Sequence, residues 1–455
     1  MKTLLKILLF VSTLCILLIG SHSAMAGVSA KEAEKLKTTL TPLGAEKAGN
    51  AEGTIPAWDG GLTTPAPGFV NGGKRPDLFP DEKPLFSITA QNMDQHADKL
   101  TDGVKALLQK YPETYRVDVY KTHRTAAAPQ WVYDNTFKNA TQGKLEGLIP
   151  KNVYGGIPFP IPKSGAEVMW NHELMWRGVS VYINMSSYLV TANGKRVNMA
   201  QAVNKTQMPY YFQNGSLEDF NGNFYSIRNK NSGPAIRRDE GILANANFDT
   251  RKSQVYVYLP GQRRVRKLPD ACCDSPTAFS SGLTSFDEVN AFTGGTLSLE
   301  RFDWKIIDKK EIYIPYNANK LFEPTVDELF GDHHFNPDYV RWELHRVWVV
   351  EANLREGSRH TSPKSIYYID EDTWGVQFAD RWDADGQLWR MVFNTSFAAP
   401  DIPATRSGTW GYYDLLGSAY YATPILNDQD VHFKTVPPYP DRAFSPAALA
   451  GEGIR

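Results

Sequence analysis

Histidines next to carboxylates are the residues of this chain whose spacing comes nearest to a catalytic or metal site. His172 and Glu173 begin like the helix of a zinc protease, but Trp176 occupies the position that needs the second histidine, so a two-histidine grip on a metal is missing. His333 and His334 are adjacent, and adjacent side chains of an extended segment point to opposite sides. We therefore predict structural or solvated roles for these histidines, and no metal or cofactor.

Glu343 and His345 lie two residues apart, which places them on one face of a predicted strand. There they could pair as a general base and the carboxylate that orients it, although an ordinary polar contact gives the same spacing. The chain has no nucleophile elbow, no phosphate-binding loop and no dinucleotide fingerprint. The sequence predicts no catalytic residues, and an enzyme of an unrecognised type stays open as an alternative.

Cys272 and Cys273 are adjacent, and they are the only cysteines after residue 26. Their Cα atoms should lie about 3.8 Å apart across a trans peptide, which is below the usual disulfide separation of about 4.4–6.8 Å. A strained vicinal disulfide, two buried thiols and a reactive pair all stay open. We favour a structural turn, because no Cys-x-x-Cys spacing marks a redox site.

Secondary-structure elements must position these residues. The first part of the chain after the leader, residues 27–165, is predicted to be largely irregular. Gly and Pro recur between residues 50 and 90 and oppose regular structure. A short helix is predicted over 30–40. A longer helix is predicted over 90–110, because apolar residues recur there at three- and four-residue spacing.

Residues 166–400 are predicted to form an antiparallel sheet. Apolar and polar residues alternate there with period two, as in Val181, Ile183 and Met185. Residues 254–268 predict a hairpin, and residues 364–394 predict further strands joined by short turns. The remaining residues, 401–455, are predicted to be a loop-rich tail.

The clearest strand covers residues 341–354 and carries the candidate ligand-binding residues. One face is predicted to be apolar, with Arg346 as a single cation on it, and the opposite face is polar. The candidate residues on the apolar face are Trp342, Leu344, Arg346, Trp348 and Val350.

Composition excludes a dedicated nucleic-acid binder. The formal net charge is −1, whereas a nucleic-acid binder needs a basic face to displace the counterions of the phosphates. Aromatic residues make up 12% of the chain, and such rings favour strands and supply broad apolar contact surfaces.

Residues 1–26 have the pattern of a cleaved secretory signal peptide. Lys2 and Lys6 precede an apolar core, and Ala24-Met25-Ala26 has the small-x-small pattern that a signal peptidase reads. A retained anchor needs about 20 apolar residues, whereas this core is interrupted by polar ones. Cys15 lies inside the core, where it is badly placed for lipidation. We expect a periplasmic protein of a Gram-negative cell.

Several longer segments are distinctive: residues 40–50, 53–58, 123–129, 154–162, 170–172 and 337–352. They resemble a family of secreted Gram-negative proteins, the domain-of-unknown-function 1329 family, and the resemblance covers nearly the whole chain after residue 26. Members of this family are often labelled outer-membrane lipoprotein-sorting proteins, because their fold is similar to that of the carriers LolA and LolB.

The resemblance implies a mainly β protein, an open antiparallel half-barrel with helices covering the concave side. It also implies association with a resistance-nodulation-division (RND)-type exporter and an outer-membrane protein. The long irregular N-terminal region departs from the small lipoprotein carriers.

From these expectations we predict a periplasmic carrier or accessory protein for a lipid-like ligand. The apolar face of 341–354 would shield the ligand, and Arg346 would meet a carboxylate or phosphate head group. Two alternatives stay open for this face and for the protein. The side chains could simply form the core beneath the covering helices, and the protein could be a non-catalytic subunit of an envelope assembly.

Overall fold

The computed structural model describes residues 27–451 apart from residues 270, 278–279 and 294–298. Residues 1–26, and with them the predicted signal peptide, lie outside the described residues. Sixteen of the described strands form one sheet in the order β1-β2-β12-β13-β14-β15-β16-β17-β5-β6-β7-β8-β9-β10, with β11 paired to β12 and β18 to β5. Because β1 and β10 do not pair, the sheet is open.

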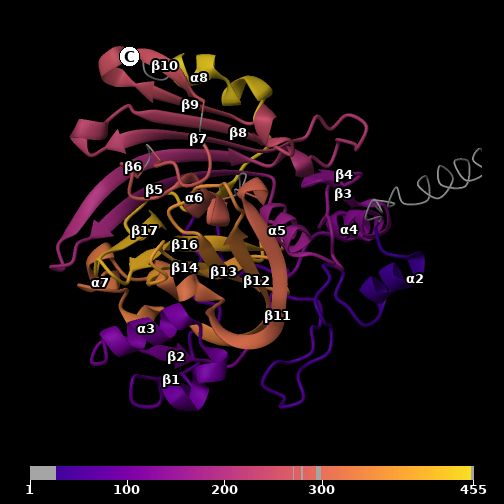
Figure 1. Ribbon diagram of the computed structural model, residues 1–455, viewed down its shortest axis with the longest axis vertical. Coiled ribbons are helices and arrows are strands. Elements are labelled where there is room, and N and C mark those ends of the chain that lie inside the picture. The colour runs from indigo at the N-terminus through magenta and orange to yellow at the C-terminus, as the bar shows by residue number, and fades with distance from the viewer. Residues whose placement is uncertain (1–26, 270, 278–279, 294–298, 452–455) are drawn as a thin grey trace, which may run out of the picture.

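The strands of this sheet run antiparallel to their neighbours, except that β2 and β12 are parallel. Figure 1 shows the sheet curling around α5 and α6. The predicted fold, a mainly β open antiparallel half-barrel, is confirmed. The first ten strands are β1 (Phe86–Ile88), β2 (Val117–Val119), β3 (Lys144–Glu146), β4 (Ile149–Lys151), β5 (Ser180–Val190), β6 (Arg196–Gln207), β7 (Asn223–Gly233), β8 (Gly241–Asn247), β9 (Gln254–Leu259) and β10 (Arg264–Leu268).

The later strands include three in the part of the chain predicted to be a loop-rich tail. They are β11 (Phe302–Pro315), β12 (Trp342–Leu354), β13 (Lys364–Asp370), β14 (Val376–Trp382), β15 (Leu388–Ala399), β16 (Ala404–Asp414), β17 (Tyr420–Ile425) and β18 (Lys434–Thr435). The prediction for the tail is wrong over β16 and β17, which lie in the middle of the sheet. Glycines obscure the strand pattern there. A Cβ on Gly411 would lie 1.8 Å from the Tyr421 carbonyl oxygen, so only glycine fits this close ladder.

Helices are short, and the longest of those described, α4, lies in the N-terminal region. The α-helices are α2 (Ala30–Ala33), α3 (Asp102–Lys110), α4 (Gln130–Gln142), α5 (Gly165–Glu173), α6 (Phe286–Thr293), α7 (Val326–Leu329) and α8 (Pro446–Gly451). The 3-10 helices are η1 (Glu34–Lys37), η2 (Met93–Lys99), η3 (Pro209–Tyr211), η4 (Ala235–Arg237), η5 (Thr250–Lys252), η6 (Pro260–Gln262), η7 (Leu299–Arg301), η8 (Ala318–Phe322), η9 (Pro337–Tyr339) and η10 (Asp441–Phe444).

The helix predicted over 90–110 is interrupted. The turns of η2 end at Leu100, whose backbone is extended, and the Thr101 side chain then accepts a hydrogen bond from the Val104 amide to begin α3. This cap satisfies a free amide at the first turn and so favours a new helix over a continued one. Later in the N-terminal region (residues 27–165), α4 forms in a segment for which the sequence predicts no helix.

Two large apolar clusters make up most of the core. The first lies on the concave face and includes Trp170 of α5 with Ile369 and Trp410 of the sheet. The second includes Leu107 of α3 with Phe378 and other residues of the sheet. The sheet is therefore buried on both faces over much of its width, with α5 and α3 in different clusters.

Cys272 and Cys273 are joined by a vicinal disulfide, with their Cα atoms 3.7 Å apart. Of the three states left open by the sequence, the structure therefore has the first. Cys273 is fully buried and has a φ of 66°, so the pair forms a turn. Within the described part of the chain, no helix has the length and apolar character needed to cross a bilayer.

Candidate functional site

An apolar cavity with a volume of about 170 Å³ lies on the concave side of the sheet. Strands β5 to β9 form one wall, β16 and β17 contribute a second, and residues of α6 complete the lining. A cavity of about 150 Å³ with an apolar lining is large enough to take up benzene. The main apolar lining comes from Val181, Ile183, Met185, Met208, Ile227, Val255, Phe286 and Trp410.

The alternation of β5 explains why this wall is apolar. Val181, Ile183 and Met185 are two residues apart, so their side chains emerge on one face of the strand. Residues opposite one another on antiparallel neighbours share a face, and the pairing of Ala244 with Ile227 extends the wall across β7 and β8.

Ion pairs in the first turn of α6 hold that helix over the cavity. Asp287 lies 3.3 Å from Arg381 of β14, and Glu288 lies 2.7 Å from Arg390 of β15. Ser285 accepts a hydrogen bond from the Glu288 amide at the start of the helix. The acidic pair 287–288 therefore lies in the first turn of α6 and also fixes the position of the helix.

Two arginines, Arg177 and Arg406, line the same cavity. Arg177 lies between α5 and β5, and its Nη2 donates to the carbonyl oxygens of His172 and Glu173 at 3.2 and 3.0 Å. Arg406 belongs to β16, and its Nη1 donates to the carbonyl oxygen of Arg177. Both side chains are buried, and the Nε of each has no hydrogen-bond partner within the described residues.

The surroundings of both guanidinium groups disfavour their charge. Burial and the nearby charges of Arg75 and Arg177 together lower the pKa of Arg406 to about 9, against the opposing effect of Asp401. Burial also lowers the pKa of Arg177, although Tyr225 and Glu173 counteract it. Positive charge is therefore concentrated beside an apolar space.

The residues predicted from the 341–354 strand are not brought together in the way expected. Trp342 and Leu344 lie in the second apolar cluster, whereas Val350 lies in the first and Trp348 packs against it. The apolar residues among them are therefore divided between two clusters instead of being gathered around one site. The strand is buried on both of its faces, and the odd-numbered Val347 and Val349 belong to the same cluster as Trp342. None of the five predicted residues lines the apolar cavity on the concave side.

Arg346 is surrounded by carboxylates. Its Nε lies 3.5 Å from Glu46 and 3.5 Å from Glu311, and its Nη1 lies 3.5 Å from Glu371. Nη1 also donates to the carbonyl oxygen of Ala48 at 2.9 Å. This guanidinium is already neutralised by the protein.

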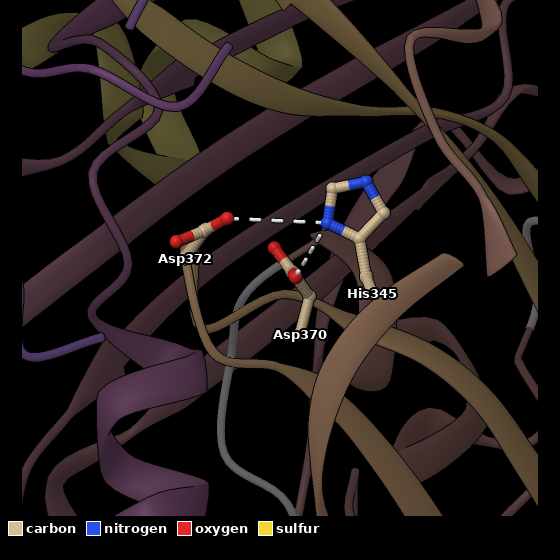
Figure 2. Close-up of side chains that lie close together, drawn as sticks. All are labelled: His345, Asp370 and Asp372. Carbon is tan, nitrogen blue, oxygen red and sulfur yellow. Dashed lines mark ion pairs between the residues drawn. The ribbon is translucent and has the colours of Figure 1, made fainter. Parts of the chain in front are cut away.

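A second buried group of ionisable residues lies around His345 (Figure 2). Its Nε2 lies 3.2 Å from Glu343, as the spacing of the two residues suggested, and its Nδ1 lies 3.7 Å from Asp370 and 3.9 Å from Asp372. All four side chains are buried. Figure 2 shows the two aspartates facing the same ring nitrogen.

The ligand atoms of His345, Asp370 and Asp372 are close enough to hold a metal ion, but Arg124 already occupies the acidic side of the group. Arg124 donates to both oxygens of Asp372, at 2.9 and 2.6 Å. A divalent cation would therefore adjoin a buried guanidinium, which opposes its binding. The donor set fits an ion-paired cluster better than a metal site.

Protons on His345 and Asp370 reduce the net negative charge of this cluster. Burial alone disfavours the imidazolium, but the hydrogen bond with Glu343 and the charge of Asp370 outweigh burial and raise the pKa of His345. Burial and the neighbouring Asp372 raise the pKa of Asp370 to about 7. Both shifts keep protons on the cluster in the folded state.

The sequence reasoning missed Arg177 and Arg406. A signal for Arg406 was present, because Arg406, Gly408 and Trp410 are two residues apart and all line the cavity. The loop prediction for residues 401–455 gives this alternation no weight. Nothing along the sequence links Arg177 with Arg406, since the two meet only after β16 and the start of β5 are brought together.

The fold, an open antiparallel sheet with a cavity on its concave side, can now be compared with known proteins. This chain is a member of the family described as "Protein of unknown function (DUF1329)", which matches residues 87–450. It is 40% identical over 468 residues to the uncharacterized protein PA3922 of Pseudomonas aeruginosa, with 100% of both chains covered. The family predicted from the longer segments is confirmed.

Two solved structures are similar in part. A DUF1329 family protein from Desulfovibrio piger is 12% identical, with a TM-score of 0.42, covering 63% of this chain and 97% of that one. The LolA superfamily protein NE2245 from Nitrosomonas europaea is 11% identical, with a TM-score of 0.36, covering 62% of this chain and 98% of that one. Each likeness takes in nearly all of the other chain and under two thirds of this one.

Proposed function

We propose that this protein carries a hydrophobic, lipid-like small molecule through the periplasm and holds its apolar part in the concave-side cavity. The observation that supports the proposal is the apolar lining contributed by β5 to β9, β16 and α6. Moving each methylene group from water into such a lining is favourable by about 0.8 kcal/mol. A long apolar molecule bound in this cavity is therefore shielded from water while the protein diffuses.

The periplasmic location belongs to the proposal and is supported by the signal-like pattern of residues 1–26. An aqueous compartment between two membranes is where an apolar molecule needs a carrier. Fractionation of cells should place the protein in the periplasmic fraction, with Gly27 as its first residue by mass spectrometry. Recovery of the uncleaved chain with the membranes would contradict this part of the proposal.

The partners implied by the resemblance, an RND-type exporter and an outer-membrane protein, complete the proposal. A carrier must contact the protein that supplies its ligand and the one that receives it. Cross-linking in intact cells, followed by mass spectrometry, should recover one or both. Recovery of neither from cells that hold ligand-loaded protein would contradict the partner assignment.

Native mass spectrometry of protein purified from periplasm tests carriage itself. We expect a recurring additional mass that solvent extraction releases as a hydrophobic molecule. Ligand-free protein that also fails to bind alkyl probes would contradict the proposal. A ligand contact for Trp342, Leu344, Arg346, Trp348 and Val350 stays a prediction, and mapping of a photoreactive alkyl probe onto the chain would show whether it labels β12 or the cavity.

A further inference from the structure

The cavity contains more positive charge than the protein neutralises. Arg75, beside the cavity arginines, is paired with Asp401 at 2.8 Å and also donates to the Phe433 carbonyl oxygen. In the described part of the chain, no carboxylate lies within ion-pairing distance of Arg177 or Arg406. The acidic groups whose charge acts on the two are Glu173 and Asp401. Three guanidinium groups thus share two carboxylates, which leaves one positive charge in excess.

The two cavity arginines also keep unused hydrogen-bond donors. Arg177 is 7% exposed and Arg406 is 8% exposed, and the Nε of each has no partner within the described residues. Burying a cation without a counter-charge is costly. Guanidinium groups pair with carboxylate and phosphate oxygens by short, charge-assisted hydrogen bonds. An anionic oxygen group is therefore the complement to this end of the cavity.

We propose that Arg177 and Arg406 bind the acidic head group, a carboxylate or a singly charged phosphate, of an amphiphile whose tail lies in the apolar cavity. The inference rests on the proposed function, because the tail occupies the cavity assigned there. It moves the head-group role from Arg346 to residues that line the cavity. One negative charge on the ligand matches the one excess positive charge.

Paired probes with the same tail test this assignment. Decanoate and decanol differ only in the charge of the head group, and their affinities are measured by displacement of a fluorescent alkyl probe. The wild-type protein should bind decanoate about tenfold more tightly than decanol, as a charge-assisted hydrogen bond implies. Arg406→Gln should remove most of this preference while leaving decanol binding within about twofold, and retained decanol binding also shows that the variant is folded.

The control variant is Arg263→Gln, because Arg263 is exposed in the turn before β10, and it should keep the full preference. Arg346→Gln tests the rival position. If Arg346→Gln abolishes the preference and Arg406→Gln does not, the inference is overturned. Equal wild-type affinities for the two probes would also overturn it, and the carrier proposal would stand.

Inorganic phosphate separates a lipid head group from a free anion. Phosphate alone should not displace decanoate at millimolar concentration, because it gains nothing from the apolar cavity. Displacement by phosphate at lower concentration than by decanoate would assign the arginines to a free anion and overturn the amphiphile. If neither decanoate nor decanol binds the wild-type protein, the proposed function itself fails.

Discussion

Arg346 and Arg406 are both cations within largely apolar strands, but their surroundings differ. Arg346 lies 3.5 Å from each of three carboxylates, whereas Arg406 donates a hydrogen bond to the backbone carbonyl oxygen of Arg177. The residues that neutralise Arg346 come from positions 46, 311 and 371, far apart in the sequence. Spacing along one strand could not show that this guanidinium is occupied.

Asp380 gives a prediction about pH at the residue scale. Burial raises its pKa to about 7, despite hydrogen bonds from the amides of α3. The folded state therefore holds this proton more tightly than the unfolded chain, whose carboxyl has a pKa near 3.8. The stabilising contribution is fully present below pH of about 4 and is lost as the pH rises to about 7.

Asp380→Asn should therefore gain stability relative to the wild type as the pH rises from about 5 to about 8. Urea unfolding at both values measures the change. The control is Asp385→Asn, since Asp385 is exposed in the turn between β14 and β15. A stability difference between Asp380→Asn and wild type that stays constant over this range would show that the carboxyl of Asp380 does not titrate in it.

At the scale of elements, Glu343 of β12 connects the N-terminal region to the sheet by hydrogen bonds. Its carboxylate accepts hydrogen bonds from the His123 amide and from Asn317, and it pairs with Arg341 at 2.6 Å. Removing one partner from a buried ion pair costs about 3–5 kcal/mol. Glu343→Gln should lower the free energy of unfolding by about 3 kcal/mol.

Glu351→Gln is the matched control on the same strand. Glu351 is half-buried and lies 3.5 Å from Lys364, whose side chain is 45% exposed. Ion pairs of this kind contribute less than about 1 kcal/mol. Chemical denaturation of the two variants should separate them clearly, and equal losses would mean that Glu343 is no more important than a surface pair.

Gly411 tests the close approach of β16 and β17. Because an added Cβ would lie 1.8 Å from the Tyr421 carbonyl oxygen, Gly411→Ala must push the two strands apart. We expect a loss of about 1–3 kcal/mol or more in the free energy of unfolding. Gly261→Ala is the control, because a Cβ there meets nothing within 4 Å. Thermal melts that fall equally for both would refute the close approach.

The elements that the sequence predicted well are those with undisturbed alternation. The hairpin over 254–268 forms as β9 and β10, and the strands predicted within 364–394 form as β13, β14 and the first part of β15. β11 escaped prediction because its register shifts between Ile306 and Asp308, which breaks the period of two. The alternation of apolar residues in β5 predicted one apolar strand face. That this face lines a cavity depends on α6 and β16, and the sequence could not show that they lie opposite β5.

At the scale of the whole molecule, a cavity-filling substitution tests whether the curved sheet holds the ligand. Ala244 is half-buried in β8 and lines the cavity. Ala244→Phe should displace at least two methylene groups of a bound tail, at about 0.8 kcal/mol each. Decanol affinity should then fall about tenfold or more.

Ala235→Phe adds the same ring on the exposed surface of η4 and should leave decanol affinity unchanged. The melting temperatures of the two variants show whether either loses its fold. If Ala244→Phe is folded and binds decanol as tightly as the wild type, the tail does not occupy this cavity.

The position of β17 in the sheet determines when, during synthesis, the sheet can fold completely. β17 lies between β16 and β5, so that Tyr420 pairs with Val190 across a long stretch of chain. The two halves of the sheet can join only once residues 420–425 are available, and such distant pairing slows folding. The proposed periplasmic location requires the chain to pass a translocation channel unfolded. A joining strand that comes late in the chain favours such a delay in folding through strand order alone.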